Sequence, residues 1–261
     1  MVALVVALAA TTSAVAGSSS SVPTKKPGKL IVGFDVPAPS FWNGRVSGTT
    51  IHNPTGFEAA LAQAIAKQLK ISKIQFLRAP FGGLFSPASK PYDFAMEEVT
   101  ITPQRAKVVG FSAPYFNANQ GVLIRKGLKK PKSLADLKKL QLCAQQETTG
   151  LAWIQHTLRP KKAPHVYSAS SSAAFDAVES GKCDALILDV PIVAAQAKKK
   201  PGAYGGVVGQ IDTHEFYGAV LDKGSKFIPD LNKAINKLKA NGTVNKLVKK
   251  WLLNPIPPVL K

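Results

Sequence analysis

The stretch DFAMEEVTITPQRAKVVGFSAPYF, residues 93–116, is the most informative segment of this chain. Its opening residues 93–96 predict a short strand with apolar side chains. Thr102 and Pro103 then supply an N-cap hydroxyl and a first-turn proline, which together start a helical turn. A strand therefore leads directly into a short helix, and that helix carries Arg105 in its first turn.

Strands and helices alternate on both sides of this stretch. The predicted strands are 29–34, 74–77, 121–124, 142–144, 184–188 and 216–221. The predicted helices are 56–69, 133–140, one that opens at Thr148 and Thr149, 173–180, and two closing helices that end near residue 253. Such alternation predicts an α/β fold with open, largely parallel sheets.

Composition favours a globular protein with a basic surface. The chain has 261 residues, of which 45% are hydrophobic and 19% charged, so it can bury a core in one large or two small domains. Its net charge is +19, but the lysines form short dispersed groups without interleaved aromatic residues. No helix-turn-helix, zinc-finger or RNA-binding motif is present. We therefore expect a solvated basic surface and no nucleic-acid partner.

The first residues predict export. Residues 1–16 form a short apolar run that ends in the small-x-small pattern Ala14-Val15-Ala16, which indicates a signal peptide. The run is too short for a stable transmembrane helix, which needs about 20 apolar residues. Residues 17–28 form a Ser-, Pro- and Lys-rich linker, and no cysteine follows the apolar run to carry a lipid anchor. We expect release into a periplasm or the medium.

Cys143 and Cys183 are the two cysteines of the chain, and each lies at or just before a predicted strand. An oxidising compartment would allow them to form a disulfide between neighbouring strands. Two buried free thiols are the alternative. The spacing alone does not choose between these two states.

The order of several motifs resembles polar-amino-acid-binding proteins of ABC transporters, the family-3 extracellular solute-binding proteins. The stretch 93–116 carries a Thr-Ile-Thr-Pro turn followed by an Arg-Ala-Lys-x-Val-x-Phe-Ser-x-Pro-Tyr pattern typical of this family. Four more segments fit in order: GFEAALAQAIAKQL, QQETTG, SGKCDALILD and LNKAINKLKANGTVNKLVKKW. The resemblance covers nearly the whole chain after the linker.

The resemblance implies a two-lobed, periplasmic-binding-protein-like α/β fold in which two hinge strands join the lobes. Residues 29–117 and 214–261 would form the first lobe, and residues 118–213 the second. The crossings would lie near 117–121 and 214–217. A ligand would bind between the lobes and be enclosed by closure about the hinge.

A free amino acid offers a carboxylate, an ammonium and a side chain. Arg105 provides a planar fork of donors for the carboxylate, and the resemblance places the family's carboxylate-binding arginine there. Thr100 matches a hydroxyl-bearing ligand position, and the backbone of Val99 is expected beside the ligand. Thr148 and Thr149 stand at a predicted helix N-terminus, which favours a carboxylate, although simple N-capping is the alternative.

Two acids and several aromatic residues complete the predicted site. Asp189 ends a predicted strand and, by resemblance, would receive the α-ammonium, while Asp35 would face the same crevice. Phe81 matches an aromatic residue that packs against the ligand. Phe41 and Trp42 are candidates for the pocket or for the core.

Two departures from the family pattern add charge to the site. Glu98 stands where a small residue is usual, and Glu147 replaces the glycine that normally precedes the two threonines. These carboxylates would favour a basic ligand, whereas the +19 background would attract an acidic one. The other reading of both glutamates is that they are solvated and silent.

The predicted function is capture of a polar, and by these glutamates basic, L-amino acid for an ABC-transporter permease. We expect a monomer that needs no cofactor and no metal, since the four histidines lack ligand spacing. One alternative is a cyclohexadienyl-dehydratase-like enzyme in which Glu98 and Glu147 act as acid or base. The other is a sensory module that docks to a membrane receptor.

Overall fold

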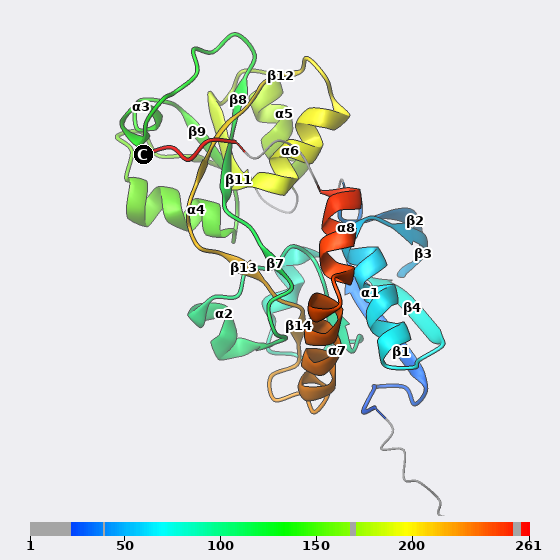
Figure 1. Ribbon diagram of the computed structural model, residues 1–261. Helices are drawn as coiled ribbons and strands as arrows, with labels where there is room; N and C mark the ends of the chain where they lie inside the picture. Colours follow the sequence, from blue (N-terminus) through cyan, green and yellow to red (C-terminus); the bar gives the residue numbers. More distant parts are fainter. Residues whose placement is uncertain (1–21, 39, 168–170, 253–256) are drawn as a thin grey trace, which may run out of the picture.

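The computed structural model describes residues 22–38, 40–167, 171–252 and 257–261, and they fold into two α/β lobes (Figure 1). The expected signal peptide, residues 1–16, and the first part of the linker lie outside the described residues. Within the described residues, no helix is long and apolar enough to cross a membrane.

Lobe 1 is built on a mixed sheet. Its strands, in spatial order, are β2 (Asn43–Ser47), β3 (Thr50–Thr55), β4 (Lys73–Arg78), β1 (Lys29–Phe34), β5 (Phe94–Ala95), β14 (Val220–Leu221) and β6 (Gly110–Phe111). Its helices are α1 (Phe57–Gln68), the 3-10 turn η1 (Phe81–Phe85), α2 (Pro103–Val108), α7 (Ile228–Ala240) and α8 (Thr243–Trp251). The sheet lies between helices, so β1 is almost wholly buried.

Lobe 2 has its own five-stranded sheet. The spatial order is β10 (His165–Tyr167), β9 (Leu142–Gln145), β11 (Ala185–Asp189), β8 (Gln120–Arg125) and β12 (Tyr204–Ile211). Its helices are α3 (Leu134–Leu137), α4 (Thr149–Trp153) with its π-helical continuation η2 (Ile154–Leu158), α5 (Ser171–Glu179) and α6 (Val190–Lys199).

The expectation of largely parallel sheets is wrong. Only β1 with β4 and β5, and β9 with β10 and β11, pair in parallel. The pairs of β8 and of β14 are antiparallel because these strands enter their sheets directly from the crossings, without a crossover helix. β2 pairs with β3, and β3 with β4, as antiparallel neighbours in sequence. The predicted strand 216–221 is two short strands, because β13 (Phe216–Tyr217) pairs with β7 (Phe116–Asn117) between the lobes whereas β14 joins the lobe 1 sheet.

Two strands pass between the lobes. β7 (Phe116–Asn117) leads upward into β8, and β13 returns from lobe 2, and the two pair antiparallel between the lobes (Figure 1). Residues from both chain directions therefore meet at the base of the gap between the two sheets. This places Gln120 and Glu215, which flank the crossings, close to both lobes.

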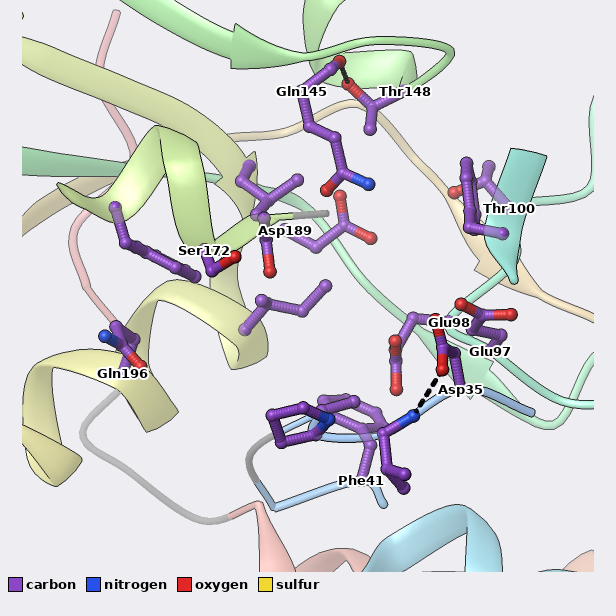
Figure 2. A pocket seen from close by; sticks show the side chains of 18 of the residues that line it. Asp35, Phe41, Glu97, Glu98, Thr100, Gln145, Thr148, Ser172, Asp189 and Gln196 are labelled. Carbon is purple, nitrogen blue, oxygen red and sulfur yellow. Dashed lines mark hydrogen bonds between the residues drawn. The ribbon is translucent and has the colours of Figure 1, made fainter. Parts of the chain in front are cut away.

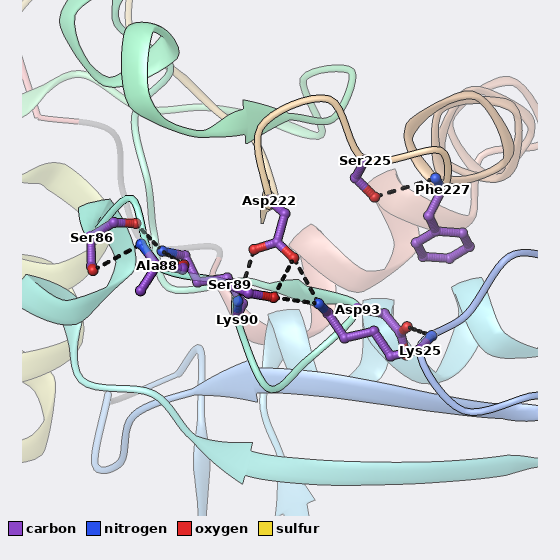
Figure 3. Close-up of polar contacts among 9 residues, drawn as sticks. All are labelled: Lys25, Ser86, Ala88, Ser89, Lys90, Asp93, Asp222, Ser225 and Phe227. Carbon is purple, nitrogen blue, oxygen red and sulfur yellow. Dashed lines mark hydrogen bonds and ion pairs between the residues drawn. The ribbon is translucent and has the colours of Figure 1, made fainter.

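The end of the linker is fastened to lobe 1 (Figure 3). The amide of Lys25 donates to Asp93 at 2.5 Å, and its ammonium forms an ion pair with Asp222 at 2.7 Å. Asp222 also accepts from the amide of Lys90. Within the predicted linker 17–28, Lys25 is therefore bound to lobe 1.

The C-terminal residues lie on lobe 2. Leu260 is 7% exposed and packs in the hydrophobic core of lobe 2, where Gly209 leaves room for it. Gln210 pairs with this tail through the carbonyl of Pro258 and the amide of Leu260. The expected boundary, which placed all of 214–261 in lobe 1, therefore fails for residues 257–261, because β12 exposes an open edge that the tail covers.

Candidate functional site

A cavity of about 450 Å³ lies between the lobes. Figure 2 shows its polar lining, with Glu97, Glu98 and Asp35 on the lobe 1 side and Asp189, Ser172 and Gln196 on the lobe 2 side. Arg105, Thr100, Thr148, Thr149 and Phe81 also line it. The structure thus brings most of the sequence-predicted site residues around one cavity.

Arg105 bridges the two lobes. The Thr102 hydroxyl caps α2 by accepting from the Arg105 amide, which fixes the start of the side chain. Its guanidinium donates to the carbonyls of Thr100 and Glu147, each at 2.8 Å, and lies over the Phe85 ring at 4.6 Å. Burial lowers the pKa of Arg105, and nearby carboxylates oppose that change. The remaining donors of the fork are available to an anion.

The threonine hydroxyls converge on Glu215. Thr100 donates to its carboxylate at 2.7 Å and Thr149 at 2.6 Å, although the two threonines belong to different lobes. Thr148 instead caps α4, since its hydroxyl accepts from the Leu151 amide. Thr148 therefore caps α4 and also lines the cavity, as Thr149 does.

Asp189 ends β11 and is 5% exposed at the cavity. It accepts from Gln120 at 2.5 Å and from the Tyr217 hydroxyl. Burial, together with the nearby Glu215, raises the pKa of Asp189 to about 7, and the two donors oppose the change. A carboxylate has about four acceptor positions, so capacity remains for a ligand ammonium.

A further carboxylate, Glu58, lies beneath the lobe 1 wall of the cavity and is fully buried. It accepts from Trp42 Nε1 at 2.6 Å, from the Tyr115 hydroxyl and from the Glu98 amide at 3.1 Å. Burial raises its pKa to about 7 against these hydrogen bonds. Glu58 therefore holds the Glu97-Glu98 turn in place from below.

Glu97 and Glu98 present the most under-satisfied polar atoms of the cavity. Oε2 of Glu97 and Oε1 of Glu98 are buried and have no hydrogen-bond partner within the described residues. Burial raises the pKa of both carboxyls well above the ordinary value, and neighbouring carboxylates raise it further. Unpartnered buried acceptors are costly, so a hydrogen-bond donor at these two oxygens would lower the free energy of the site.

The backbone at Glu98 and Glu147 explains why small residues suit these positions. Both residues have positive φ, 50° and 64°, in the left-handed region that favours glycine. A glutamate held there costs on the order of 1 kcal/mol or more in backbone strain. The Glu147 carboxylate lies beside Gly82, while its carbonyl accepts from Arg105. Glu98 therefore lines the cavity, whereas Glu147 lines a smaller neighbouring pocket with Phe81 and Gly82.

Asp35 and Phe81 form one end of the cavity. Asp35 accepts from Arg78 Nε at 2.8 Å and from the Val36 amide at 2.9 Å. Phe81 starts η1 and lies 5.5 Å from the Arg105 guanidinium, as an aromatic wall. Both residues line the cavity as the sequence predicts.

The structure corrects the expectation for Val99 and decides between the two readings of Phe41 and Trp42. Val99 is fully buried in the core of lobe 1, its carbonyl accepts from the Gly218 amide, and it does not line the cavity. Trp42 is also fully buried and stacks on Phe34 with ring centroids 3.5 Å apart. Of the pair 41–42, only Phe41 reaches the cavity wall.

Cys143 and Cys183 are joined in a disulfide behind the lobe 2 sheet. Asp184, which follows Cys183, pairs with Arg125 at 2.8 Å and accepts from the Gln141 amide. That carboxylate is therefore structural. In the part of the chain that the structure describes, no group of three or more His, Cys, Asp or Glu side chains could hold a metal ion.

Sequence reasoning missed several polar residues at the site. They are Glu58, Arg78, Glu97, Gln120, Gln145, Glu215 and Tyr217. Glu97 could have been predicted from the sequence, because it directly follows the predicted strand 93–96, as Glu98 does one residue later. Gln120 and Glu215 had none, because each becomes meaningful only when the two crossings meet.

Comparison with known proteins agrees with this geometry. The arginine-binding periplasmic protein of Mannheimia haemolytica is 29% identical over 206 residues, which is 76% of this chain and 81% of that protein. The glutamine-binding protein GlnH of Bacillus subtilis is 30% identical over 205 residues, which is 76% of this chain and 72% of that protein. These relatives are named for different amino acids.

Solved structures show the same likeness. An ancestral arginine-binding protein bound to arginine has a TM-score of 0.74 and 33% identity, covering 87% of this chain and 99% of that chain. An ancestral amino acid-binding protein, a precursor of cyclohexadienyl dehydratase, has a TM-score of 0.73 and 32% identity, covering 87% and 96%. The family model for bacterial extracellular solute-binding proteins, family 3, matches residues 30–254, and the chain belongs to this family.

Proposed function

We propose that this protein binds a basic L-amino acid outside the cytoplasm and delivers it, as a monomer, to the permease of an ABC transporter. The observation that carries the choice of a basic ligand is the pair Glu97 and Glu98, whose buried carboxylate oxygens lack partners. A guanidinium or ammonium group supplies the missing donors and the opposite charge. The strained backbone at Glu98 supports a role for its side chain.

The charge distribution also favours a cationic ligand. Five of the 15 acidic residues line the cavity, against four of the 34 basic ones. With all these groups ionised the cavity wall carries a net charge of −1, whereas the chain as a whole carries +19. Local charges act on a bound ligand more strongly than distant, solvent-screened ones.

The constant part of an amino acid fits the other end of the site. Arg105 and Thr149 would hold the α-carboxylate, and Asp189, supported by Gln120 and Tyr217, would hold the α-ammonium. Two oppositely charged groups then fix the ligand's orientation and aim its side chain toward Glu97 and Glu98.

Binding of L-arginine and L-citrulline, measured by calorimetry, tests the proposal, because citrulline replaces the guanidinium by a neutral group of similar shape. We expect arginine to bind at least about 30-fold more tightly, as befits charge-assisted hydrogen bonds. The Glu98→Gln variant should bind arginine more weakly and should show a smaller ratio of arginine to citrulline affinity. The Asp184→Asn variant, which changes a residue outside the cavity, should alter neither the affinity for arginine nor this ratio. Equal affinity for the two ligands would contradict the proposal.

The same samples also distinguish a binding protein from an enzyme with dehydratase activity. Recovery of the ligand unchanged after long incubation is the expected result. Conversion of a ligand, with loss of that conversion in Glu98→Gln, would favour an enzyme instead.

A further inference from the structure

The outer face of lobe 1 has an unbalanced charge. Helices α1, α7 and α8 pack on one another along the same side of lobe 1 (Figure 1). Exposed lysines on this face, here called the lysine face, are Lys67, Lys70, Lys233, Lys237, Lys239, Lys246, Lys249 and Lys250. The acids on these helices are Glu58, which is fully buried, and Asp230.

The lysine face arises from the amphipathic pattern of the helices. Leu231, Ala234, Ile235 and Leu238 bury one side of α7 against the core, so Lys233 and Lys237 point outward. None of the lysines of this face forms an ion pair with a carboxylate among the described residues. Their charge is therefore available to a partner.

The acids of the chain are committed elsewhere. In lobe 2, Lys139 pairs with Asp136, Arg125 with Asp184, and Lys200 with Glu179. Other acids line the cavity or fasten Lys25. The lysine face thus carries eight exposed lysines and one partly exposed carboxylate on its helices, Asp230, so its positive charge is largely unbalanced.

We propose that the lysine face binds the anionic surface of a phospholipid bilayer. The lysines are spread over three neighbouring helices rather than along a groove, and arginine, which suits phosphate and base recognition in nucleic acids, is absent from the three helices. A bilayer is a broad, laterally uniform anionic surface, and flexible lysines fit it without a fixed geometry. Each lysine near such a surface strengthens association about fivefold.

This role goes beyond amino-acid binding and uses none of the cavity residues. None of the lysines of the lysine face lines the cavity between the lobes. Adsorption through these helices would keep the protein near the membrane while the cavity stays open to ligand. The binding would be reversible and sensitive to salt, because the Debye length is about 10 Å at 0.1 M.

Co-sedimentation of the chain without residues 1–16 tests the proposal, using vesicles of phosphatidylcholine with and without about one third phosphatidylglycerol. We expect binding to the anionic vesicles alone, weakening as salt rises. A variant with Lys233, Lys237, Lys246 and Lys249 changed to Gln should bind at least about tenfold less tightly.

The matched control changes the exposed lysines Lys129, Lys130, Lys161 and Lys162 of lobe 2 to Gln, which lowers the net charge equally. It should bind within about threefold of the parent. Equal losses in both variants, no binding to anionic vesicles, or binding to duplex DNA in place of vesicles would overturn the proposal. Unchanged melting temperatures show that the variants fold, and the result does not depend on which amino acid the cavity binds.

Discussion

Replacing Arg105 by lysine tests the orientation of the ligand most directly. The change keeps the positive charge but removes the planar fork, which spans from Thr100 in lobe 1 to Glu147 in lobe 2. A lysine retains one good contact to a carboxylate. The expected loss is about 3 kcal/mol, on the basis of about 1.5–3 kcal/mol for each hydrogen bond to a charged group.

That loss corresponds to a dissociation constant about 100-fold higher, measured by calorimetry against the tightest-binding amino acid. Arg78→Lys is the matched control, because Arg78 also lines the cavity but its side chain is 50% exposed and pairs with Asp35. Its effect should stay below about fivefold. The melting temperature without ligand should fall by less than about 4 °C in either variant. An Arg105→Lys protein that binds within about threefold of the parent would refute the assigned carboxylate site.

Three further outcomes follow from the buried groups. Glu58, whose pKa is raised from 4.5 to about 7, keeps a proton in the folded protein that the unfolded chain releases, so unfolding free energy should fall as pH rises between these values. Denaturant titrations at several pH values should show that the Glu58→Gln variant lacks about 3 kcal/mol of this fall in unfolding free energy. If the variant and the parent show the same dependence on pH, the raised pKa of Glu58 is contradicted. Asp189→Asn should weaken ligand binding about 100-fold by calorimetry, and a loss below about fivefold would exclude Asp189 as the ammonium partner. Changing Cys143 and Cys183 together to Ala opens a loop with a sequence separation of 40 and should lower the free energy of unfolding by about 3–4 kcal/mol in urea, whereas a loss under about 1 kcal/mol would show that the bridge contributes little.

Local patterns predicted the central elements well. The strand 29–34 is observed at those residues, and the helix expected over 56–69 is α1, residues 57–68. In both, the pattern of apolar residues alone predicts which residues are buried. Thr102 and Pro103 likewise act at the start of α2 as their side chains predict. These features depend on residues that are close in sequence, so one sequence is enough to predict them.

Features that depend on distant segments were not predictable. The strand 204–211 contains three glycines and has weak strand propensity, yet it forms because β8 offers a free edge and Leu260 packs against Gly209. Similarly, no sequence pattern marks Glu215 as a site residue, but its carboxylate accepts hydrogen bonds from Thr100 in lobe 1 and from Thr149 in lobe 2. Long-range pairing therefore determines the parts of the site that the sequence left out.

Because the C-terminal residues return to lobe 2, Lys25 and Lys261 are attached to different lobes. Lys25 is bound to lobe 1, while the carbonyl of Lys261 accepts from the Leu134 amide in lobe 2. A donor and an acceptor dye attached near Lys25 and Lys261 would therefore sense any rotation of one lobe against the other. Dyes at these two positions would thus report ligand capture optically, with every residue of the cavity left intact.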